Sequence, residues 1–420
     1  MASPTDHPAS LAERLIAGTI AATWVLWLIG GLYFAGPLLG WTLGAMACAR
    51  LYLGHARPPG ALVMLWLGGM AVMLVALLVG HIENDLGAAQ TLKSVAGWAK
   101  GWALLALFPL AGAVLPIRSS VIVRATCRLG AQSLALIPIF AVAPYVGLPK
   151  TLWVSPLVVL GGSGPEYFST ILYTFEPGTS APRWQFFAPW SPAIGFVAAI
   201  SALIAGEERH RGWRAIGIAA ALAMALMSQS RLALVAIVLA WPTAWLVARF
   251  ARPSTWFAAA PGALLAGFFA QSLLALAQQA TSDFNGARAA SSRVRATLGR
   301  IAVERWRNEA PWFGHGIVER GPHLVEYMPI GSHHSWFGLL FVKGLVGVLA
   351  LAVPLFGSLI LTAVEAGRLH EARRALALLF VLLLYSFGEN LEVLGYLIWP
   401  GLILIGTAAR SDAKRGTARS

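Results

Sequence analysis

Charged residues are scarce in this chain. Lysine, arginine, aspartate and glutamate together supply 12% of its 420 residues, whereas soluble domains usually carry about 25%. Hydrophobic residues supply 58%, and several apolar runs approach the roughly 20 residues with which a helix spans a bilayer. Backbone groups in lipid must be hydrogen-bonded inside the protein, which favours helices. The composition therefore argues against a soluble domain and predicts an all-α, polytopic membrane protein.

Cysteine is almost absent. Cys48 lies in a hydrophobic run and Cys127 in a basic segment that is expected to be a loop, so neither a disulfide nor a cysteine metal site is expected. The start of the chain lacks a clear A-x-A cleavage site and has a long polar stretch before its first apolar run. Residues 1–30 are therefore expected to be a retained anchor rather than a cleaved signal peptide.

Twelve apolar segments are expected to cross the membrane. They are residues 15–30, 33–49, 61–80, 101–117, 131–148, 190–206, 214–228, 231–248, 254–277, 336–364, 375–388 and 392–409. They divide the chain into six parts. The N-terminal bundle at 1–148 is followed by a long loop at 149–189 and central helices at 190–277. A second long loop at 278–335, C-terminal helices at 336–409 and a basic tail at 410–420 complete the chain.

Basic residues are spread unevenly over the linkers. The net charge of +13 could indicate a nucleic-acid partner, but the distribution gives another explanation. One alternating set of linkers holds Arg50, Arg57, Arg118, Arg124, Arg128, Arg209, Arg211, Arg214, Arg249, Arg252, Arg368, Arg373 and Arg374. The positive-inside rule places these linkers and both termini in the cytoplasm. The two long loops then face outward, and no nucleic acid is expected as a partner.

The pair Ser230-Arg231 stands between two apolar runs. Serine is a favoured N-cap, so a helix is expected to begin at Arg231. An arginine gains nothing from the positive end of a helix dipole. An anion bound there would gain from both the free N–H groups and the guanidinium. The alternative is that the Arg231 side chain extends to the outer lipid headgroups.

Both long loops carry arginines that could bind an anion. Arg183 lies in the first loop among aromatic residues, which also suit a membrane interface. The second loop is expected to be helical up to about Asn308, before Pro311. Its arginines either form a solvated face, or contact the anionic headgroups of membrane lipids, or bind an anionic substrate; they include Arg288, Arg293, Arg295 and Arg300.

Two adjacent histidines precede a long apolar run in the sequence GSHHSWFGLLFVKGLVG, residues 331–347. A helix is expected to begin near Gly331-Ser332, with His333 and His334 in its first turn. The helix dipole disfavours a charged imidazolium there, so a neutral histidine could act as a general base. Adjacent histidines point to different faces of a helix, and no metal site is expected.

Three further residues near this stretch are candidates for supporting roles. Lys343 is expected near the outer interface. Gly344 and Gly347 are expected to allow close helix packing. Glu389, in the last outer turn, either lines the same cavity as the histidines or caps a helix.

Three motifs follow one another within residues 190–365. They are Ser230-Arg231, then Trp306 with Pro311, Gly314 and Gly316, then Ser332-His333 with Gly344 and Gly347. This ordered set resembles the O-antigen ligase and polymerase superfamily of bacterial envelope proteins. In that family the histidine usually precedes the first glycine of the last motif by eleven residues, a spacing that matches His333 rather than His334. His334 stands where the family commonly has asparagine, and Lys343 where many ligases have an acidic or small residue nearby.

The resemblance implies a glycosyltransferase of the bacterial inner membrane whose active site faces the periplasm. Its donor would be a glycan on undecaprenyl diphosphate, and its acceptor another glycan or a lipid A-core. His333 would accept the acceptor's proton, and arginines would neutralise the diphosphate: Arg231 first, then Arg183 and some of Arg288, Arg293, Arg295 and Arg300. No metal or other cofactor is then needed. Polymerases of capsular polysaccharide or exopolysaccharide and ligases that build lipopolysaccharide both fit.

Two other kinds of protein stay open at the level of sequence. A secondary transporter or exporter of an anionic or lipid-linked substrate often has twelve spans, although transporters commonly show repeated halves and no repeat is visible here. A non-catalytic scaffold or lipid-binding subunit would need the arginines but not His333.

Overall fold

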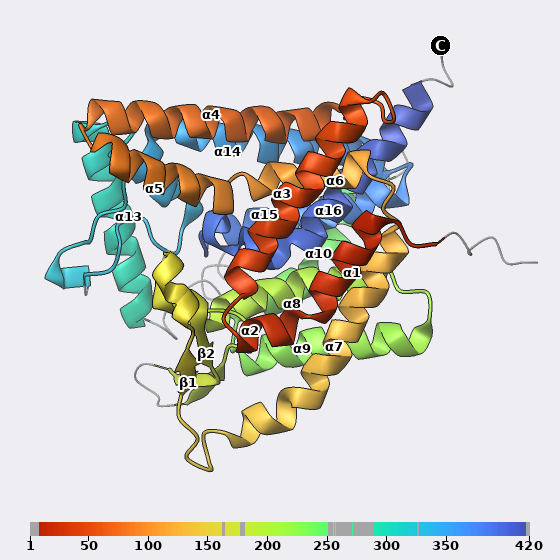
Figure 1. Cartoon of the computed structure of the whole chain (residues 1–420), viewed down its shortest axis with the longest axis horizontal. Coiled ribbons are helices and arrows are strands. Elements are labelled where there is room, and N and C mark those ends of the chain that lie inside the picture. The colour runs from red at the N-terminus through yellow and green to blue at the C-terminus, as the bar shows by residue number, and fades with distance from the viewer. Residues whose placement is uncertain are drawn as a thin grey trace, which may run out of the picture.

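A computed structural model describes residues 8–161, 164–176, 181–250, 289–325 and 327–416, with Thr255, Phe257 and Gln271. The described residues form a bundle of long helices, most of which run along the longest axis of the molecule (Figure 1). Seven stretches among them are helical, long and apolar enough to cross a membrane: Leu32–Tyr52, Ala61–Glu83, Gly87–Val114, Ser119–Val142, Arg231–Phe250, Ser335–Ala366 and Leu391–Arg410. The structure therefore agrees with the predicted fold class, a helical membrane protein.

Between residues 8 and 148 the regular elements are all helices. They are α1 (Leu11–Ala21), α2 (Thr23–Leu28), α3 (Leu32–Tyr52), α4 (Ala61–Glu83), α5 (Gly87–Lys100), α6 (Leu104–Val114) and α7 (Ser119–Val142). Ser10 and Glu13 form a capping box at the start of α1, each side chain accepting a backbone N–H of the other residue. This box fixes where the first helix begins.

Two predicted boundaries in this part are wrong. The segment predicted at 101–117 begins earlier, because the polar helix α5 precedes the short apolar helix α6 and only the two together are long enough to cross a membrane. The segment predicted at 131–148 begins at Ser119, so Cys127 lies in a helix and not in a loop. Arg124 is compatible with that helix because Glu208 pairs with it, with Nε 2.8 Å from Oε2.

The first long loop contains short strands, so the fold is not purely α-helical. Strand β1 (Thr151–Val154) pairs antiparallel with β2 (Ser169–Ile171), and β3 (Tyr173–Phe175) pairs with β4 (Pro182–Trp184). Two 3₁₀ turns lie between β1 and β2, at Pro156–Leu160 and Pro165–Phe168. The sequence of this loop mixes glycine, proline and aromatic residues, which favour turns and short strands over helix.

The C-terminal part completes the bundle. Its helices are α8 (Ser191–Gly206), α9 (Arg211–Met227), α10 (Arg231–Phe250), α13 (Ala289–Glu309), α14 (Ser335–Ala366), α15 (His370–Ser386) and α16 (Leu391–Gly416), with a 3₁₀ turn at His323–Val325. The helix expected up to about Asn308 is confirmed as α13. The segment predicted at 254–277 lies outside the described residues except for Thr255, Phe257 and Gln271.

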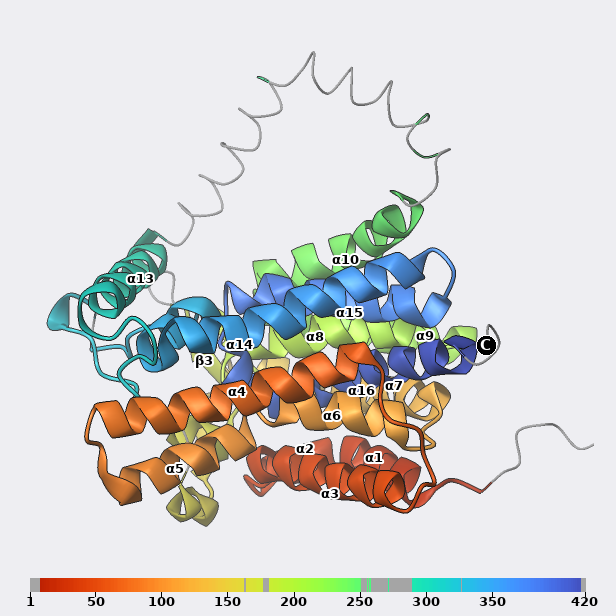
Figure 2. The same cartoon turned by 90° about the horizontal axis from the view of Figure 1, so that it is seen from above.

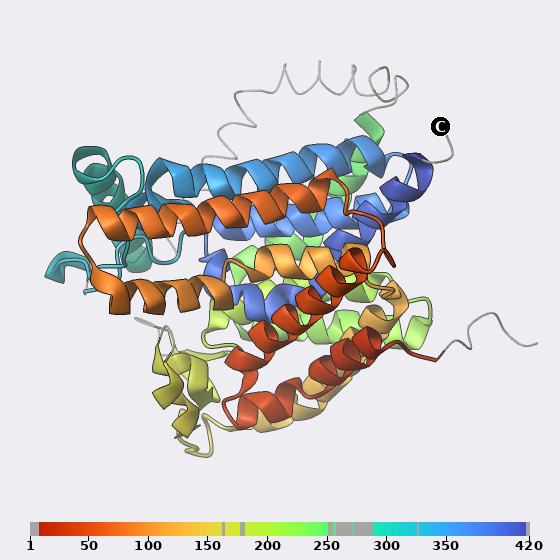
Figure 3. The same cartoon turned by 45° about the horizontal axis from the view of Figure 1, so that its top comes forward.

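Close backbone contacts hold the centre of the bundle together. Helix α14 runs along α4 and α16 runs along α6 (Figures 2 and 3). A Cβ at Gly112 would overlap the carbonyl of Ile403, and a Cβ at Gly406 would overlap that of Pro109. Small residues at such positions let membrane helices approach closely, so α6 and α16 pack backbone to backbone.

The connections gather at two ends of the bundle. At the end that we call the basic end, Glu207 and Glu208 in the loop after α8 pair with His370 and Arg124. Helix α1 begins and α16 ends at this end (Figure 1). At the opposite end, which we call the loop end, lie α13, the four strands and the corner between α4 and α5 (Figure 3). The described parts of both long loops therefore lie at the same end, as the sequence predicts.

Candidate functional site

The start of α14 differs from the prediction. The helix begins at Ser335, and His334 is its N-cap, with the Phe337 N–H donating to His334 Nδ1 at 3.3 Å. His333 precedes the helix and has a φ of 59°, in the left-handed region. Neither histidine lies in the first turn, because the imidazole of His334 satisfies a backbone donor that would otherwise be exposed at the helix end. The two side chains therefore have separate tasks.

His333 faces a buried carboxylate. Its Nδ1 lies 4.0 Å from Oε2 of Glu389, and the two side chains are 30% and 2% exposed. Trp190 Nε1 donates to the same Glu389 oxygen at 3.0 Å. Ser335 Oγ donates to the Glu389 carbonyl at 2.8 Å. Of the two alternatives for Glu389, the structure thus supports the one that places it beside the histidines, held from α8 and from α14.

Burial changes the proton affinity of both groups. It lowers the pKa of His333 to about 4, and the positive charge of Arg295 acts in the same direction. Burial also raises the pKa of Glu389 to about 7, against the opposing effects of Arg295, Trp190 and Arg183. The imidazole is therefore neutral near pH 7, as expected, but the cause is loss of hydration rather than a helix dipole. A neutral imidazole beside a titrating carboxylate can accept a proton.

Arg183 lies against the turn that precedes α10. It forms an ion pair with Glu176, Nη1 to Oε2 at 2.8 Å, and its Nε and Nη2 donate to the Ser228 carbonyl at 3.3 and 3.2 Å. Ser230 caps α10, with the Ala233 N–H donating to its Oγ at 3.4 Å, so the predicted N-cap is confirmed. Arg231 is the first residue of that helix. Arg183 and the Ser230-Arg231 pair, far apart in sequence, therefore meet at one turn.

This turn belongs to the same neighbourhood as His333. Arg183 is close enough to Glu389 for its charge to act on that carboxylate. The buried side chain of Tyr385 lies near both Ser230 and Glu389. The histidine, the carboxylate and the Ser230-Arg231 turn thus adjoin one another at the loop end.

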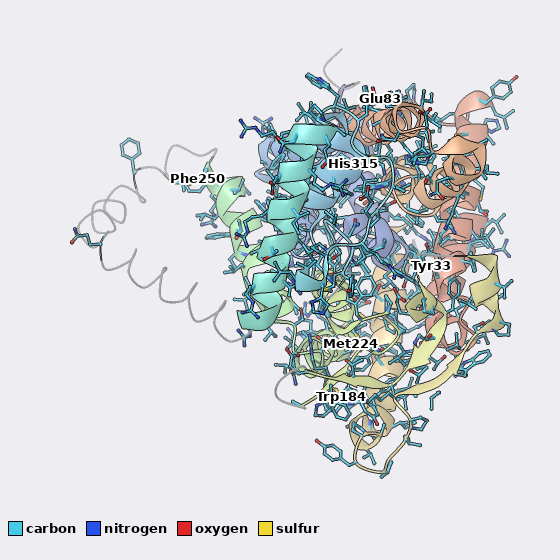
Figure 4. The ribbon with its side chains drawn as sticks, turned by 90° about the vertical axis from the view of Figure 1, so that its left-hand side faces the viewer. Tyr33, Glu83, Trp184, Met224, Phe250 and His315 are labelled. Atoms are coloured by element: carbon cyan, nitrogen blue, oxygen red, sulfur yellow. The ribbon has the colours of Figure 1, made fainter. Side chains whose placement is uncertain are left out.

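The arginines of the second long loop are placed differently from one another. Helix α13 lies across the loop end, with His315 beside it (Figure 4). Arg295 lies close enough for its charge to act on both His333 and Glu389. Arg293 is exposed, as is Arg300, whose Nη2 donates to Thr297 Oγ1 at 3.2 Å. Arg288 lies outside the described residues. Arg295 is exposed as well, but of the described arginines predicted on this loop it is the one whose charge acts on His333.

The glycine-rich turn after α13, residues 310–316, forms hydrogen bonds on both sides of a break in α14. Gly344 has a φ of 59° and a ψ of −160°, which are not helical. Across this break the N–H groups of His315 and Gly316 donate to the carbonyls of Phe341 and Val342, both at 2.9 Å. On the far side, the N–H groups of Leu345 and Val346 donate to the carbonyls of Pro311 and Trp312, at 2.9 and 3.1 Å.

Gly344 was expected to allow close packing between helices, but it packs against the turn after α13 instead. A Cβ at Gly344 would overlap the carbonyl of Trp312, and Gly347 lies under the side chain of Lys343. Lys343 is buried, with 5% of its surface exposed, and it lies within range of the charge on Glu392. Gly314 and Gly344 therefore allow the close contact between the turn and the helix.

The corner between α4 and α5 holds the same turn from the other side. His81 Nε2 lies 3.1 Å from the Gly316 carbonyl, and Asn84 Nδ2 donates to the Gly314 carbonyl at 3.0 Å. Neither these two contacts nor the contact of Trp190 with Glu389 was predicted from the sequence. His81 and Asn84 are recognisable in the sequence only as polar residues at the end of an apolar helix, and this pattern does not indicate which residues they contact.

Within the described residues, histidine, cysteine, aspartate and glutamate side chains form no group of three or more that could hold a metal ion. Neither the protein-family models nor the curated proteins contain a match to this chain.

Proposed function

We propose that the chain is a membrane glycosyltransferase that moves a glycan from an undecaprenyl-diphosphate carrier to a glycan or lipid A-core acceptor. It would cross the bacterial inner membrane twelve times, with both termini in the cytoplasm and the loop end in the periplasm. The observation that carries the proposal is His333, neutral and 4.0 Å from the buried Glu389, at the same end as Arg183, Arg231 and Arg295. Surface polysaccharide polymerase and O-antigen ligase are both compatible with it.

His333 is the general base in this proposal. Its Nδ1 faces Glu389, so Nε2 is the nitrogen that takes the proton from the acceptor hydroxyl. The acceptor oxygen bonds to the anomeric carbon of the donor while the bond from that carbon to the phosphate oxygen breaks. Glu389 stabilises the imidazolium that forms. A positioned base of this kind contributes roughly 10²–10⁴-fold in rate.

The arginines stabilise the leaving group. Undecaprenyl diphosphate departs with additional negative charge, and guanidinium groups bind phosphate oxygens in a bidentate manner. Arg231 stands at the N-terminus of α10, where free N–H groups also favour an anion. Arg183 of β4 lies against the turn before that helix, and the charge of Arg295 on α13 reaches His333. Charge stabilisation by fixed arginines needs no metal ion.

The test compares the two neighbouring histidines. His333→Ala is expected to abolish the surface polysaccharide and to leave lipid-linked glycan accumulating, at normal membrane levels of the protein. The matched control is His334→Asn, because asparagine also caps helices well and should retain most activity. Immunoblots for protein level and gels of extracted glycans provide the measurement. Normal polymer in the His333→Ala strain would overturn the assignment of the base.

The same gels separate the two kinds of transferase in a strain that lacks the protein. Single repeats attached to the final acceptor, with no long chains, indicate a polymerase. Long chains that stay on the lipid carrier indicate a ligase.

A further inference from the structure

A small cavity at the basic end takes no part in the proposed reaction. It has a volume of about 190 Å³ and lies among three helices. Its lining consists of Trp245, Ala248 and Arg249 of α10, Gly367 after α14, and Arg373 of α15. Two guanidinium groups from different helices therefore meet at one cavity, and none of the described residues that line it is acidic. This composition favours an anionic ligand.

Both guanidinium groups are oriented by their neighbours. Arg249 lies over the ring of Trp245, with 3.7 Å between its guanidinium carbon and the ring centroid. Arg373 donates from Nε and Nη2 to the Ala366 carbonyl, at 3.2 and 3.1 Å. A phosphate group that binds between them would meet groups already in place, which lowers the entropy cost of binding.

Exposed apolar side chains lead toward the cavity along two helices. On α10, Val238 and Trp245 are exposed and lie seven residues apart, and Arg249 follows four residues after Trp245. On α14, Ile360 and Val364 are exposed and precede Gly367 at the cavity. Residues at these spacings share one face of a helix.

The two helices meet where these faces end. A Cβ at Gly367 would come within 2.9 Å of the Ala248 carbonyl, so the end of α14 touches α10. A ligand that fits both the arginines and the exposed faces has a phosphate at one end and hydrocarbon chains behind it.

We propose that this cavity binds the phosphate of an anionic phospholipid, whose acyl chains lie along α10 and α14. A zwitterionic lipid would bring its own cation to two guanidinium groups and gain less. A free phosphate would gain nothing from the apolar faces. Basic pockets between membrane helices on the cytoplasmic side are suited to such headgroups, and the basic end is the side that the positive-inside rule assigns to the cytoplasm.

The test uses the full-length chain, purified and stripped of lipid in detergent. Phosphatidylglycerol, phosphatidylcholine or glycerol 3-phosphate is added, native mass spectrometry counts bound lipid, and thermal unfolding reports Tm. Phosphatidylglycerol is expected to stay bound and to raise Tm, whereas the other two should do neither. Arg249→Ala should weaken phosphatidylglycerol binding about fivefold, since one basic residue near a charged lipid contributes about 1 kcal/mol.

The matched control is Arg211→Ala, which removes an exposed arginine at the start of α9, at the same end of the molecule. Arg249 is the better variant than Arg373, because Arg373 also ties down the end of α14. Equal binding of phosphatidylcholine, equal stabilisation by glycerol 3-phosphate, or equal losses in the Arg249 and Arg211 variants would each overturn the proposal. These outcomes do not depend on whether the protein transfers glycans.

Discussion

Glu389 is the ionisable residue on which the proposed chemistry depends most closely. It is almost fully buried, accepts a hydrogen bond from Trp190 and lies 4.0 Å from His333. Burial alone would keep such a carboxyl group protonated, but Arg295 and Arg183 favour its ionised form, and the pKa is about 7. The group can therefore change its charge within the physiological range of pH.

This pKa leads to a prediction about pH. Because only ionised Glu389 stabilises a protonated His333, transferase activity should fall as the pH drops below about 7. In Glu389→Gln this step should vanish, and activity at pH 8 should be lower by about 10²-fold, within the range for base catalysis. Rates of glycan transfer between pH 5.5 and 8.5 in isolated membranes provide the measurement. Glu83→Gln, an exposed glutamate at the same end, is the control, and an unchanged pH profile in Glu389→Gln would contradict the pairing.

Arg231 leads to a second prediction at the level of single residues. Arg231→Lys should lose most activity, because an ammonium group cannot replace the bidentate fork at a diphosphate. Arg307→Lys changes an exposed arginine on α13 and should have little effect. Transfer rates at several donor concentrations provide the measurement. If Arg231→Lys matched the unaltered protein, Arg231 would have no role in holding the diphosphate.

At the scale of elements, the break in α14 is the feature that connects distant parts of the chain. The turn after α13 supplies hydrogen bonds on both sides of Gly344, and the corner after α4 holds the same turn. Side-chain contacts also link α13 to this region: Arg305 forms an ion pair with Glu309 at 2.8 Å, and His315 Nε2 lies 2.7 Å from Oε2 of Glu309. The first turns of α14, next to His333, are therefore positioned from three directions.

Gly344→Ala should disrupt this arrangement. A left-handed backbone costs a residue with a side chain about 1–3 kcal/mol, and the Trp312 carbonyl leaves no space for a Cβ. We expect a lower Tm in detergent and reduced transfer activity. Gly68→Ala is the matched control, because Gly68 lies within α4 with nothing near its Cβ position and alanine favours helix. Equal Tm values for Gly344→Ala and Gly68→Ala would show that the break in α14 does not require a glycine at position 344.

Some of the helix boundaries were predictable from the sequence. The N-cap at Ser230 and the helix α13 follow from local signals, a serine before an apolar run and a proline after a helical pattern. The start of α14 was misplaced because His334, which is not a typical capping residue, caps the helix. The role of Gly344 was missed because its partner is the carbonyl of Trp312, which lies on another segment.

At the scale of the whole molecule, the helices divide polar groups between two ends. The short linkers that carry arginines meet at the basic end, and the described parts of the two long loops meet at the loop end together with His333 and Glu389. This separation matches the charge asymmetry that the positive-inside rule requires. It also means that the proposed reaction and the proposed lipid site lie at opposite ends of the bundle.

The orientation can be tested with introduced cysteines in a Cys48→Ala, Cys127→Ala background. Lys150→Cys lies at the loop end and His55→Cys in the loop between α3 and α4, and both positions are exposed. A membrane-impermeant maleimide should label Lys150→Cys in spheroplasts and His55→Cys only after lysis. The opposite pattern would reverse the topology and place His333 in the cytoplasm.

The sequence by itself determined that this is a helical membrane protein, that its arginine-rich linkers alternate, and that a helix begins at Arg231. These properties follow from composition and from periodicity over a few turns, which the chain carries locally. Only the tertiary structure decided that Trp190 donates to Glu389 across 199 residues of sequence, that His333 faces the same carboxylate, and that Gly344 breaks α14 against a distant turn. Such contacts depend on how the helices pack, because a buried polar group needs a partner that no local pattern specifies.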